Sequence, residues 1–105
     1  MLAVDKESFQ AEIKECKGYA LVDFWSESCE SCKALMPEVI ALSEKYGEKI
    51  KFAKLDVAKA RRLAIGEKVL GLPTFVLYND GEKIDEVNKD NATIGNIEAM
   101  IQKVL

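Results

Sequence analysis

Two cysteines that stand between an apolar strand pattern and a long helical pattern constrain the fold of this chain most. The run YALVDFW (Tyr19–Trp25) is apolar on both faces apart from one acid, which is typical of a central strand covered on both sides. Cys29 and Cys32 follow it, and a helix is predicted from the cysteines to about Tyr46. A buried strand that leads directly into a helix indicates an α/β protein built in layers.

The rest of the chain alternates strand and helix patterns before a late hairpin. Ile50–Val57 and Thr74–Asn79 are predicted as buried strands, with a short helix or irregular helical turn between them. Asp80 and Gly81 form a strong hairpin signal that leads into the segment EKIDEVN. We therefore expect a central mixed β-sheet of four to five strands with helices on both faces, in a single domain over residues 1–105.

Helices are also predicted near both ends of the chain. Asp5 can cap a helix from about Lys6 to Cys16, which Gly18 ends, and Thr93 can cap a C-terminal helix. Pro37 is expected to kink the long central helix. The residues expected on the packing faces are Phe9, Ile13 and Cys16 in the first helix, Leu35, Val39, Leu42 and Tyr46 in the central helix, and Ile97, Met100, Ile101, Val104 and Leu105 in the C-terminal helix.

Composition and charge exclude several classes of function. The 105 residues are 49% hydrophobic and carry a net charge of −3 that is mixed along the chain, without the basic stripe that nucleic acid binding requires. No uninterrupted apolar run approaches the roughly 18 residues of a membrane span, and no leader pattern precedes the first predicted helix. We expect a cytoplasmic monomer that binds neither nucleic acid nor membrane.

The spacing of the two cysteines favours dithiol–disulfide chemistry. At a helix start, residues i and i+3 lie on one face, close enough for a disulfide, and the free N–H groups of the first turn stabilise a thiolate. Cys16, the third cysteine, is expected to be a small core residue. The chain has no histidine and no second cysteine pair, so we expect no metal and no cofactor; an incidental pair or a metal shared between chains is the alternative.

Three further residues stand out in or next to the predicted strands. Asp23 interrupts an apolar strand, where burial should raise its pKa and suit it to proton transfer; the alternative is an ordinary acid in a salt bridge. Lys54 breaks the next strand and is the expected partner of Asp23, although by itself it would more often be an edge residue. Pro73, between Leu72 and Thr74, precedes a third strand. A cis peptide bond is possible there, but cis X–Pro bonds are rare, so the spacing alone favours a trans bond.

These motifs occur in the order VDFW, CxxCK, Pro37, AKLDV, GLPTF and a DG hairpin, and together they closely resemble the thioredoxin family over nearly the whole chain. The resemblance implies the thioredoxin fold and the activity of a thiol–disulfide oxidoreductase, a dithiol electron carrier that reduces protein disulfides. It implies that Cys29 forms a mixed disulfide with the client protein and that Cys32 resolves it. It also implies partners: disulfide-containing clients, and a thioredoxin reductase that is linked to NADPH or to ferredoxin.

The resemblance also assigns roles to neighbouring residues. Asp23 matches the buried acid of the family, which assists proton transfer at Cys32, and Lys54 matches the lysine beside that acid. Trp25 matches the tryptophan packed at the site. Pro73 matches a cis-proline that faces the disulfide, and the backbone of Leu72 is expected to pair with a bound client segment as an added strand.

The chain departs from the family pattern at two places that should affect recognition. The usual WCGPC is replaced by Ser28-Cys29-Glu30-Ser31-Cys32, so Glu30 and Ser31 are expected to contact partners and the reductase could be a dedicated one. The charge of Glu30 should destabilise the thiolate and make the protein at least as strong a reductant as an ordinary thioredoxin.

The second departure lies where the family usually has a glycine that lines the substrate groove. Here Lys89, Asp90 and Asn91 occupy that segment, and they should narrow or recharge the groove unless the loop merely tolerates them. Two other functions remain open at this point: a disulfide isomerase or oxidase of the same fold, and a redox-silent module that docks proteins in the groove.

Overall fold

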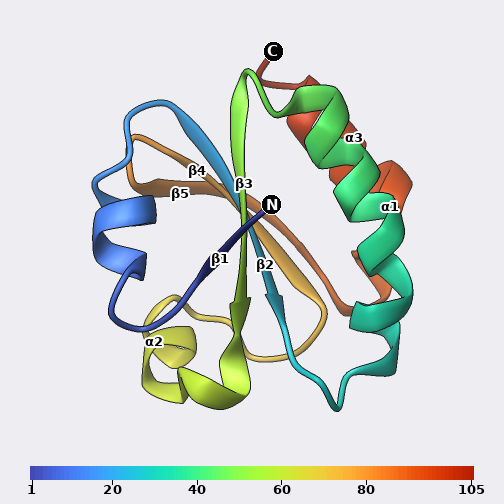
Figure 1. Ribbon diagram of the computed structural model, residues 1–105. Helices are drawn as coiled ribbons and strands as arrows, with labels where there is room; N and C mark the ends of the chain where they lie inside the picture. The colour runs from blue at the N-terminus through green and yellow to red at the C-terminus, as the bar shows by residue number, and fades with distance from the viewer.

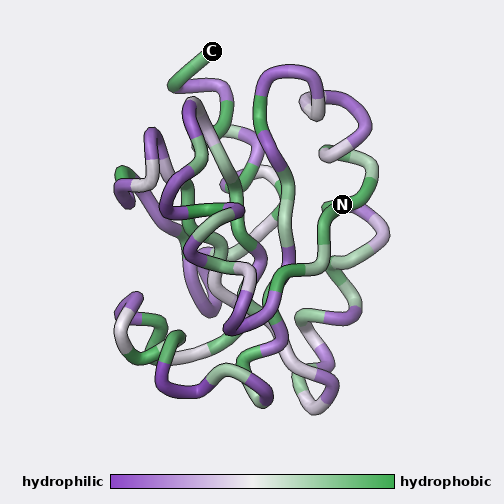
Figure 2. The backbone as a smooth tube through the Cα atoms, turned by 60° about the vertical axis from the view of Figure 1, so that its left-hand side comes forward, coloured by the Kyte–Doolittle hydropathy of each residue, from purple (hydrophilic) through white to green (hydrophobic).

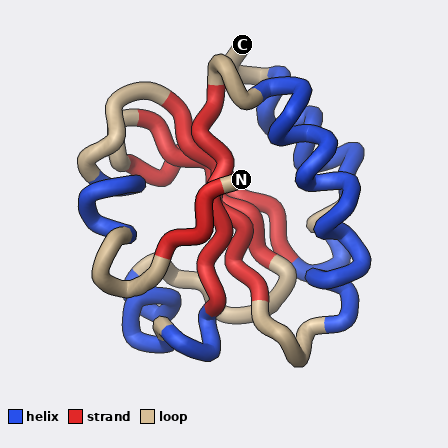
Figure 3. The backbone as a smooth tube through the Cα atoms, in the orientation of Figure 1, coloured by secondary structure: helices blue, strands red, loops and turns tan.

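The computed structural model describes residues 1–105 around one five-stranded mixed sheet, which runs through the centre of the molecule (Figure 3). The strand order is β1-β3-β2-β4-β5. β1 and β2 run parallel to β3, whereas β4 is antiparallel to β2 and β5 is antiparallel to β4. The strands are β1 (Leu2–Val4), β2 (Tyr19–Trp25), β3 (Ile50–Asp56), β4 (Thr74–Asn79) and β5 (Glu82–Asn88).

Four of these strands were predicted almost to the residue, and β1 was missed. β1 has only three residues, of which Val4 alone is buried, so it is too short to show an alternating pattern. It adds a parallel edge strand beside β3, with Leu2 opposite Ala53.

Three α-helices and three shorter helical segments accompany the strands. They are α1 (Glu30–Tyr46), α2 (Arg61–Gly66) and α3 (Ile94–Gln102), with a π-helix over Gln10–Lys14 and 3₁₀ turns over Val57–Lys59 and Lys89–Asn91. Thr93 caps α3 by accepting the N–H of Asn96, as predicted. Pro37 lies inside α1. None of the helices is long and apolar enough to cross a bilayer.

The helices cover both faces of the sheet, as predicted. α1 and α3 lie together on one side, while α2 and the N-terminal segment lie on the other (Figure 1). The side chains of β2 alternate between two cores: Leu21 packs with Val39 and Leu42 of α1, and Val22 packs with Phe9 and Ile13. The face that Leu21 shares with α1 is the face that carries the chemistry described below.

The hairpin between β4 and β5 is tied to the beginning of β2. Asp80 and Gly81 have φ values of 51° and 82°, the left-handed region that a tight two-residue turn requires. The Asp80 carboxylate accepts the N–H of Gly18 at 2.7 Å, and the Asp80 N–H donates to the Gly18 carbonyl at 2.9 Å. A side chain at Gly81 would collide with the Lys14 backbone, so only glycine fits there.

Two details of the terminal helices were predicted wrongly. Asp5 does accept the N–H groups of Glu7 and Ser8, but the helix that follows is a short π-helix ending at Lys14. Cys16 therefore lies beyond its end, half-buried, and is not a core residue. Leu105 does not pack either: it is 50% exposed, and the hydrophobic C-terminus projects from the body, green in Figure 2.

Candidate redox site

Cys29 and Cys32 form a disulfide at the beginning of α1. Cys29 is the N-cap residue, and its sulfur accepts the backbone N–H of Cys32 at 3.2 Å. Cys32 is 1% exposed, whereas Cys29 is only partly buried. One sulfur of the pair is therefore accessible to another molecule, and the other is enclosed by the protein.

Charged and hydroxyl side chains surround the accessible sulfur. The Ser31 hydroxyl lies 3.6 Å from the Cys29 sulfur. Glu30 is exposed and forms an ion pair with Lys33 at 3.3 Å, one helical turn further along. The hydroxyl groups of Ser28 and Ser26 share a hydrogen bond of 3.1 Å. Glu30 thus places its charge in solvent beside Cys29, partly offset by Lys33.

Pro73 lies at the same end of the sheet as the disulfide. Thr74 is paired with Phe24 near the carboxyl end of β2, so Pro73 is level with the point where the chain leaves β2 for α1. The Leu72–Pro73 peptide bond is cis, so the trans bond favoured by spacing alone was wrong and the cis-proline implied by the family resemblance is confirmed. The Pro73 carbonyl accepts the N–H of Lys89 at 2.8 Å, which joins the proline to the segment before α3.

Asp23 is a buried carboxyl group without a partner. It is 1% exposed, and neither carboxylate oxygen has a hydrogen-bond partner. Side chains two apart on a strand share a face, so Asp23 points to the side of the sheet that Leu21 shares with α1. Burial raises the pKa of Asp23 to about 7, and the positive charge of Lys54 opposes part of that rise.

Lys54 is the neighbour of Asp23 in the sheet but not its ion-pair partner. The two residues are directly paired between β2 and β3. The Lys54 ammonium lies 5.6 Å from the centre of the Trp25 ring, and the ion pairs of the protein do not include it. The interpretation of Asp23 as an ordinary salt-bridged acid is wrong, and Lys54 affects Asp23 through its field rather than through a hydrogen bond.

A groove of about 420 Å³ lies beside Pro73, between α1 and the segment that leads into α3. Lys89 and Asp90 line it, as predicted, but Asn91 does not; its carbonyl accepts the side-chain amide of Asn96 instead. Sequence analysis did not predict that α1 lines one side of this groove, although the helical spacing of residues that follow Ser31 could have indicated it. The other residues that line the groove are Ala34, Leu35, Glu38, Leu72, Ala92, Thr93 and Ile94.

The accessible sulfur can exchange its disulfide with a thiol of another protein, because thiol–disulfide exchange needs only a thiolate with access to one sulfur. A second, enclosed sulfur then closes the cycle, and a carboxyl group that titrates near neutrality lies on the same side of the sheet. This arrangement defines a thiol–disulfide oxidoreductase.

The comparisons with known proteins agree with that class. The thioredoxin family model matches residues 1–103, and this chain belongs to the thioredoxin family. It is 56% identical to a thioredoxin of Acetoanaerobium sticklandii over 105 residues, which is 100% of both chains. It is 53% identical to a thioredoxin of Peptoclostridium acidaminophilum, covering 98% of this chain and 94% of that one. The crystal structure of Fasciola hepatica thioredoxin superposes with a TM-score of 0.88 at 30% identity, covering 98% of each chain.

Proposed function

We propose that this oxidoreductase is a dithiol electron carrier that reduces disulfides in client proteins through Cys29. The observation that carries the proposal is the unequal exposure of the two cysteines, since Cys32 is 1% exposed and Cys29 is only partly buried at a helix N-terminus. Only Cys29 can meet a bulky client disulfide, and the first turn of α1 stabilises its thiolate.

The reaction proceeds in two exchanges. The Cys29 thiolate attacks one sulfur of the client disulfide, which forms a mixed disulfide and releases one client thiolate. The Asp23 carboxylate then takes the proton of the Cys32 thiol, directly or through water, because its pKa of about 7 matches this transfer. The Cys32 thiolate attacks the Cys29 sulfur, which releases the second client thiolate and restores the Cys29–Cys32 disulfide. Lys54 tunes the proton affinity of Asp23.

The client segment binds across Pro73 and the groove beside it. No hydrogen bond within the chain uses the amide or carbonyl of Leu72, so this residue can pair with an extended client segment as an added strand. Trp25 ends β2 just before the disulfide site, and its ring contacts the Lys54 ammonium. Glu30 and Ser31 border the accessible sulfur and contact the partner next to the exchanging bond.

The cycle requires an external electron donor. Thioredoxins act with reductases and with disulfide-containing clients, and we propose a reductase linked to NADPH or to ferredoxin that is adapted to the CESC sequence of this chain. We further propose that residues 1–105 form one domain that works as a monomer in the cytoplasm. Both cores rest on the same five-stranded sheet, which supports a single folding unit.

The test is a trap that separates the two cysteines. Cys32→Ser should retain Cys29 as a nucleophile but prevent resolution, so clients accumulate as mixed disulfides that mass spectrometry can identify. Cys29→Ser should capture nothing and should abolish the reduction of insulin with dithiothreitol as the electron source. Insulin reduction that survives Cys29→Ser would remove Cys29 from the mechanism, and a redox-silent docking module would then be the better description.

A further inference from the structure

Lys89 lies in the segment where the thioredoxin family usually has a glycine, and its backbone keeps a conformation that glycine favours. Its φ is 51°, in the left-handed region that is costly for a residue with a side chain. Asp80 and Lys68 share this region, but they lie in the hairpin turn and just beyond the end of α2, where it is common. Lys89 instead begins a 3₁₀ turn directly after β5. A backbone cost at this point of the groove indicates that the side chain is used.

The side chain of Lys89 lies across Gly71, in the loop that leads to the cis peptide bond. Its Cε occupies the space that a β-carbon at residue 71 would need. Gly71 precedes Leu72, whose amide and carbonyl are free to pair with a client segment. The end of the Lys89 side chain therefore lies beside the backbone that the client segment uses.

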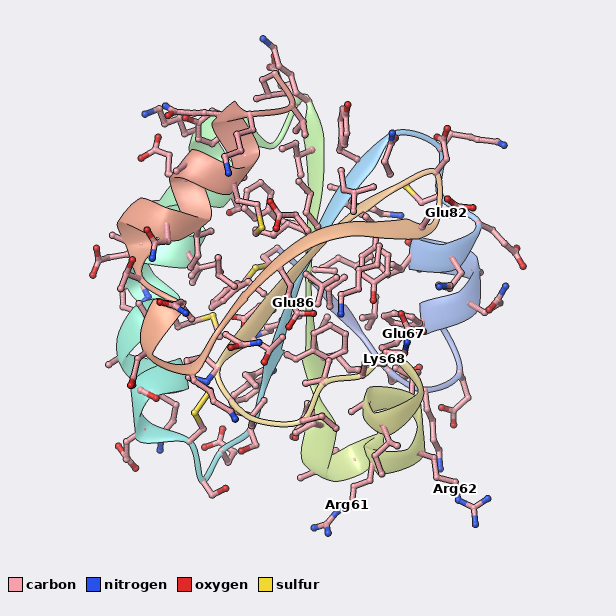
Figure 4. The ribbon with its side chains drawn as sticks, turned by 180° about the vertical axis from the view of Figure 1, so that it is seen from behind. Arg61, Arg62, Glu67, Lys68, Glu82 and Glu86 are labelled. Carbon is pink, nitrogen blue, oxygen red and sulfur yellow. A yellow bond between two sulfur atoms is a disulfide. The ribbon has the colours of Figure 1, made fainter.

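The ammonium group of Lys89 has no partner within the chain. It takes part in none of the ion pairs, and the side chain is exposed. Glu86, on the neighbouring strand β5 (Figure 4), is already occupied, because it pairs with Lys83 and accepts the side-chain amide of Asn88 at 2.7 Å. An unpaired positive charge thus stands at the edge of the groove beside Pro73.

Two carboxylates, those of Glu38 and Asp90, line the same groove, and neither forms an ion pair with Lys89. Glu38 follows Ser31 by two helical turns, a distance of about 10 Å along α1, and Ser31 is the residue of the groove whose hydroxyl lies beside the Cys29 sulfur. The atoms nearest to a β-carbon at residue 71 all belong to Lys89. Lys89 is therefore the charged residue of the groove that lies on the loop before Pro73.

We propose that Lys89 is a specificity-determining residue, which selects clients with an acidic side chain close to the cysteine that Cys29 attacks. This inference rests on the proposed function and names a preferred class of client. An extended segment paired with Leu72 advances about 3.3 Å per residue, so side chains within about two positions of the client cysteine can reach the Lys89 ammonium. An unpaired ammonium attracts a carboxylate and repels a basic side chain at the same place.

The experiment measures the first exchange with peptides that differ in one charge. Each short peptide is otherwise neutral, contains one cysteine in a mixed disulfide with 2-thiopyridine, and carries Glu, Gln or Lys at one position beside that cysteine. The Cys29 thiolate of the reduced protein attacks the peptide sulfur, forms a disulfide with the peptide and releases 2-thiopyridine, the better leaving group, whose absorbance reports the rate. The ratio of the rate constants for the Glu and Gln peptides cancels any difference in Cys29 reactivity between variants.

The wild-type protein should react about 1.5- to 5-fold faster with the Glu peptide than with the Gln peptide at low ionic strength, the size expected for one exposed ion pair. The Lys peptide should react more slowly than the Gln peptide, and both differences should shrink at high ionic strength. Lys89→Gln should bring the Glu/Gln ratio close to unity, whereas Lys89→Arg keeps the charge and should retain the preference. The control is Lys49→Gln, which removes an exposed unpaired charge at the opposite end of the sheet and should leave the ratio at its wild-type value.

Equal rates with all three peptides at every flanking position would overturn the inference, as would a Glu preference that Lys89→Gln retains. A preference for the Lys peptide that Glu38→Gln removes would assign the selectivity to the carboxylates of the groove and would overturn it as well. Release of 2-thiopyridine that survives Cys29→Ser at the wild-type rate is a different result, because it would contradict the proposed function itself.

Discussion

Asp23 and Lys54 face each other across the β2–β3 ladder, yet the lysine turns away from the acid and lies over the Trp25 ring. The ammonium group is 5.6 Å from the ring centre, and both carboxylate oxygens of Asp23 are left without a hydrogen bond. A salt bridge would hold the pKa of Asp23 low, whereas burial without a bonded partner raises it to about 7. The geometry of this pair therefore determines whether Asp23 can exchange a proton at neutral pH.

Asp23→Asn should stabilise the oxidised protein at alkaline pH and leave its stability nearly unchanged at about pH 4. The native pKa of Asp23 lies above its ordinary value of 3.8, so the folded state holds the proton more tightly and loses stability as pH rises through this range. The stability that the folded protein loses by ionising Asp23 reaches at most about 4 kcal/mol at about pH 8, since each pKa unit corresponds to ~1.4 kcal/mol. Urea unfolding at the two pH values measures the difference. A gain of equal size at both would mean that Asn improves packing rather than removing a buried charge.

Lys54→Gln should move the pH dependence of activity upward. The positive charge of Lys54 lowers the pKa of Asp23, so its removal leaves burial unopposed and raises that pKa further. The inflection near pH 7 in the rate of insulin reduction should shift to higher pH, and Asp23→Asn should abolish it.

Trp25→Phe is the matched control for this shift. Phenylalanine retains a ring beneath the Lys54 ammonium, so the inflection should stay near its wild-type position. A shift as large as that of Lys54→Gln would show that the tryptophan, and not the lysine charge, sets the proton affinity of Asp23.

The sequence was sufficient to predict elements with strong periodicity and the burial of a single acid that interrupts an apolar strand. β2 and β4 were predicted with their observed bounds because both are continuous apolar runs, and Asp23 was recognised because it interrupts one. β1 was missed because three residues show no period, and the π-helix before Gly18 was predicted as an ordinary helix because its wider turn also brings Phe9 and Ile13 inward.

The orientation of side chains within the site was the part that sequence could not provide. Adjacent positions of Asp23 and Lys54 suggested an ion pair, but the side chain of Lys54 lies over the Trp25 ring instead, a choice of rotamer that no sequence pattern encodes. A shallow apolar groove of about 300 Å³ beside α2 was likewise not predicted, because its lining comes from three separate segments: the turn at Val57, α2, and the loop that contains Leu70.

Glu30→Gln should make the protein a weaker reductant. The negative charge of Glu30 beside Cys29 disfavours the thiolate of the reduced form, so its removal should shift the potential to a more positive value by about 10 mV, the size expected for an exposed charge. Lys33→Gln should shift the potential to a more negative value, because Lys33 offsets Glu30 through their ion pair at 3.3 Å. The measurement is the equilibrium constant between each variant and the wild-type protein. Shifts in the same direction for both variants would rule out the charge explanation.

Gly71→Ala should alter client reduction only while Lys89 is present. A methyl group at Gly71 would collide with the aliphatic part of the Lys89 side chain, which lies across the glycine, and would displace that side chain within the groove beside Pro73. Lys89 itself adopts a φ of 51°, a conformation that favours glycine, so Lys89→Gly should be tolerated and should stabilise the fold by about 0.5 kcal/mol.

The double variant tests the coupling between Gly71 and Lys89. With a peptide disulfide as client, Gly71→Ala should change kcat/KM about 2- to 5-fold in the wild-type background, the size of a coupling between residues in contact. In the Lys89→Gly background the same substitution should have no effect, because the side chain that it displaces is gone. Equal effects in both backgrounds would show that the added methyl group acts on the Leu72–Pro73 backbone, and that Lys89 does not shape the groove for the client.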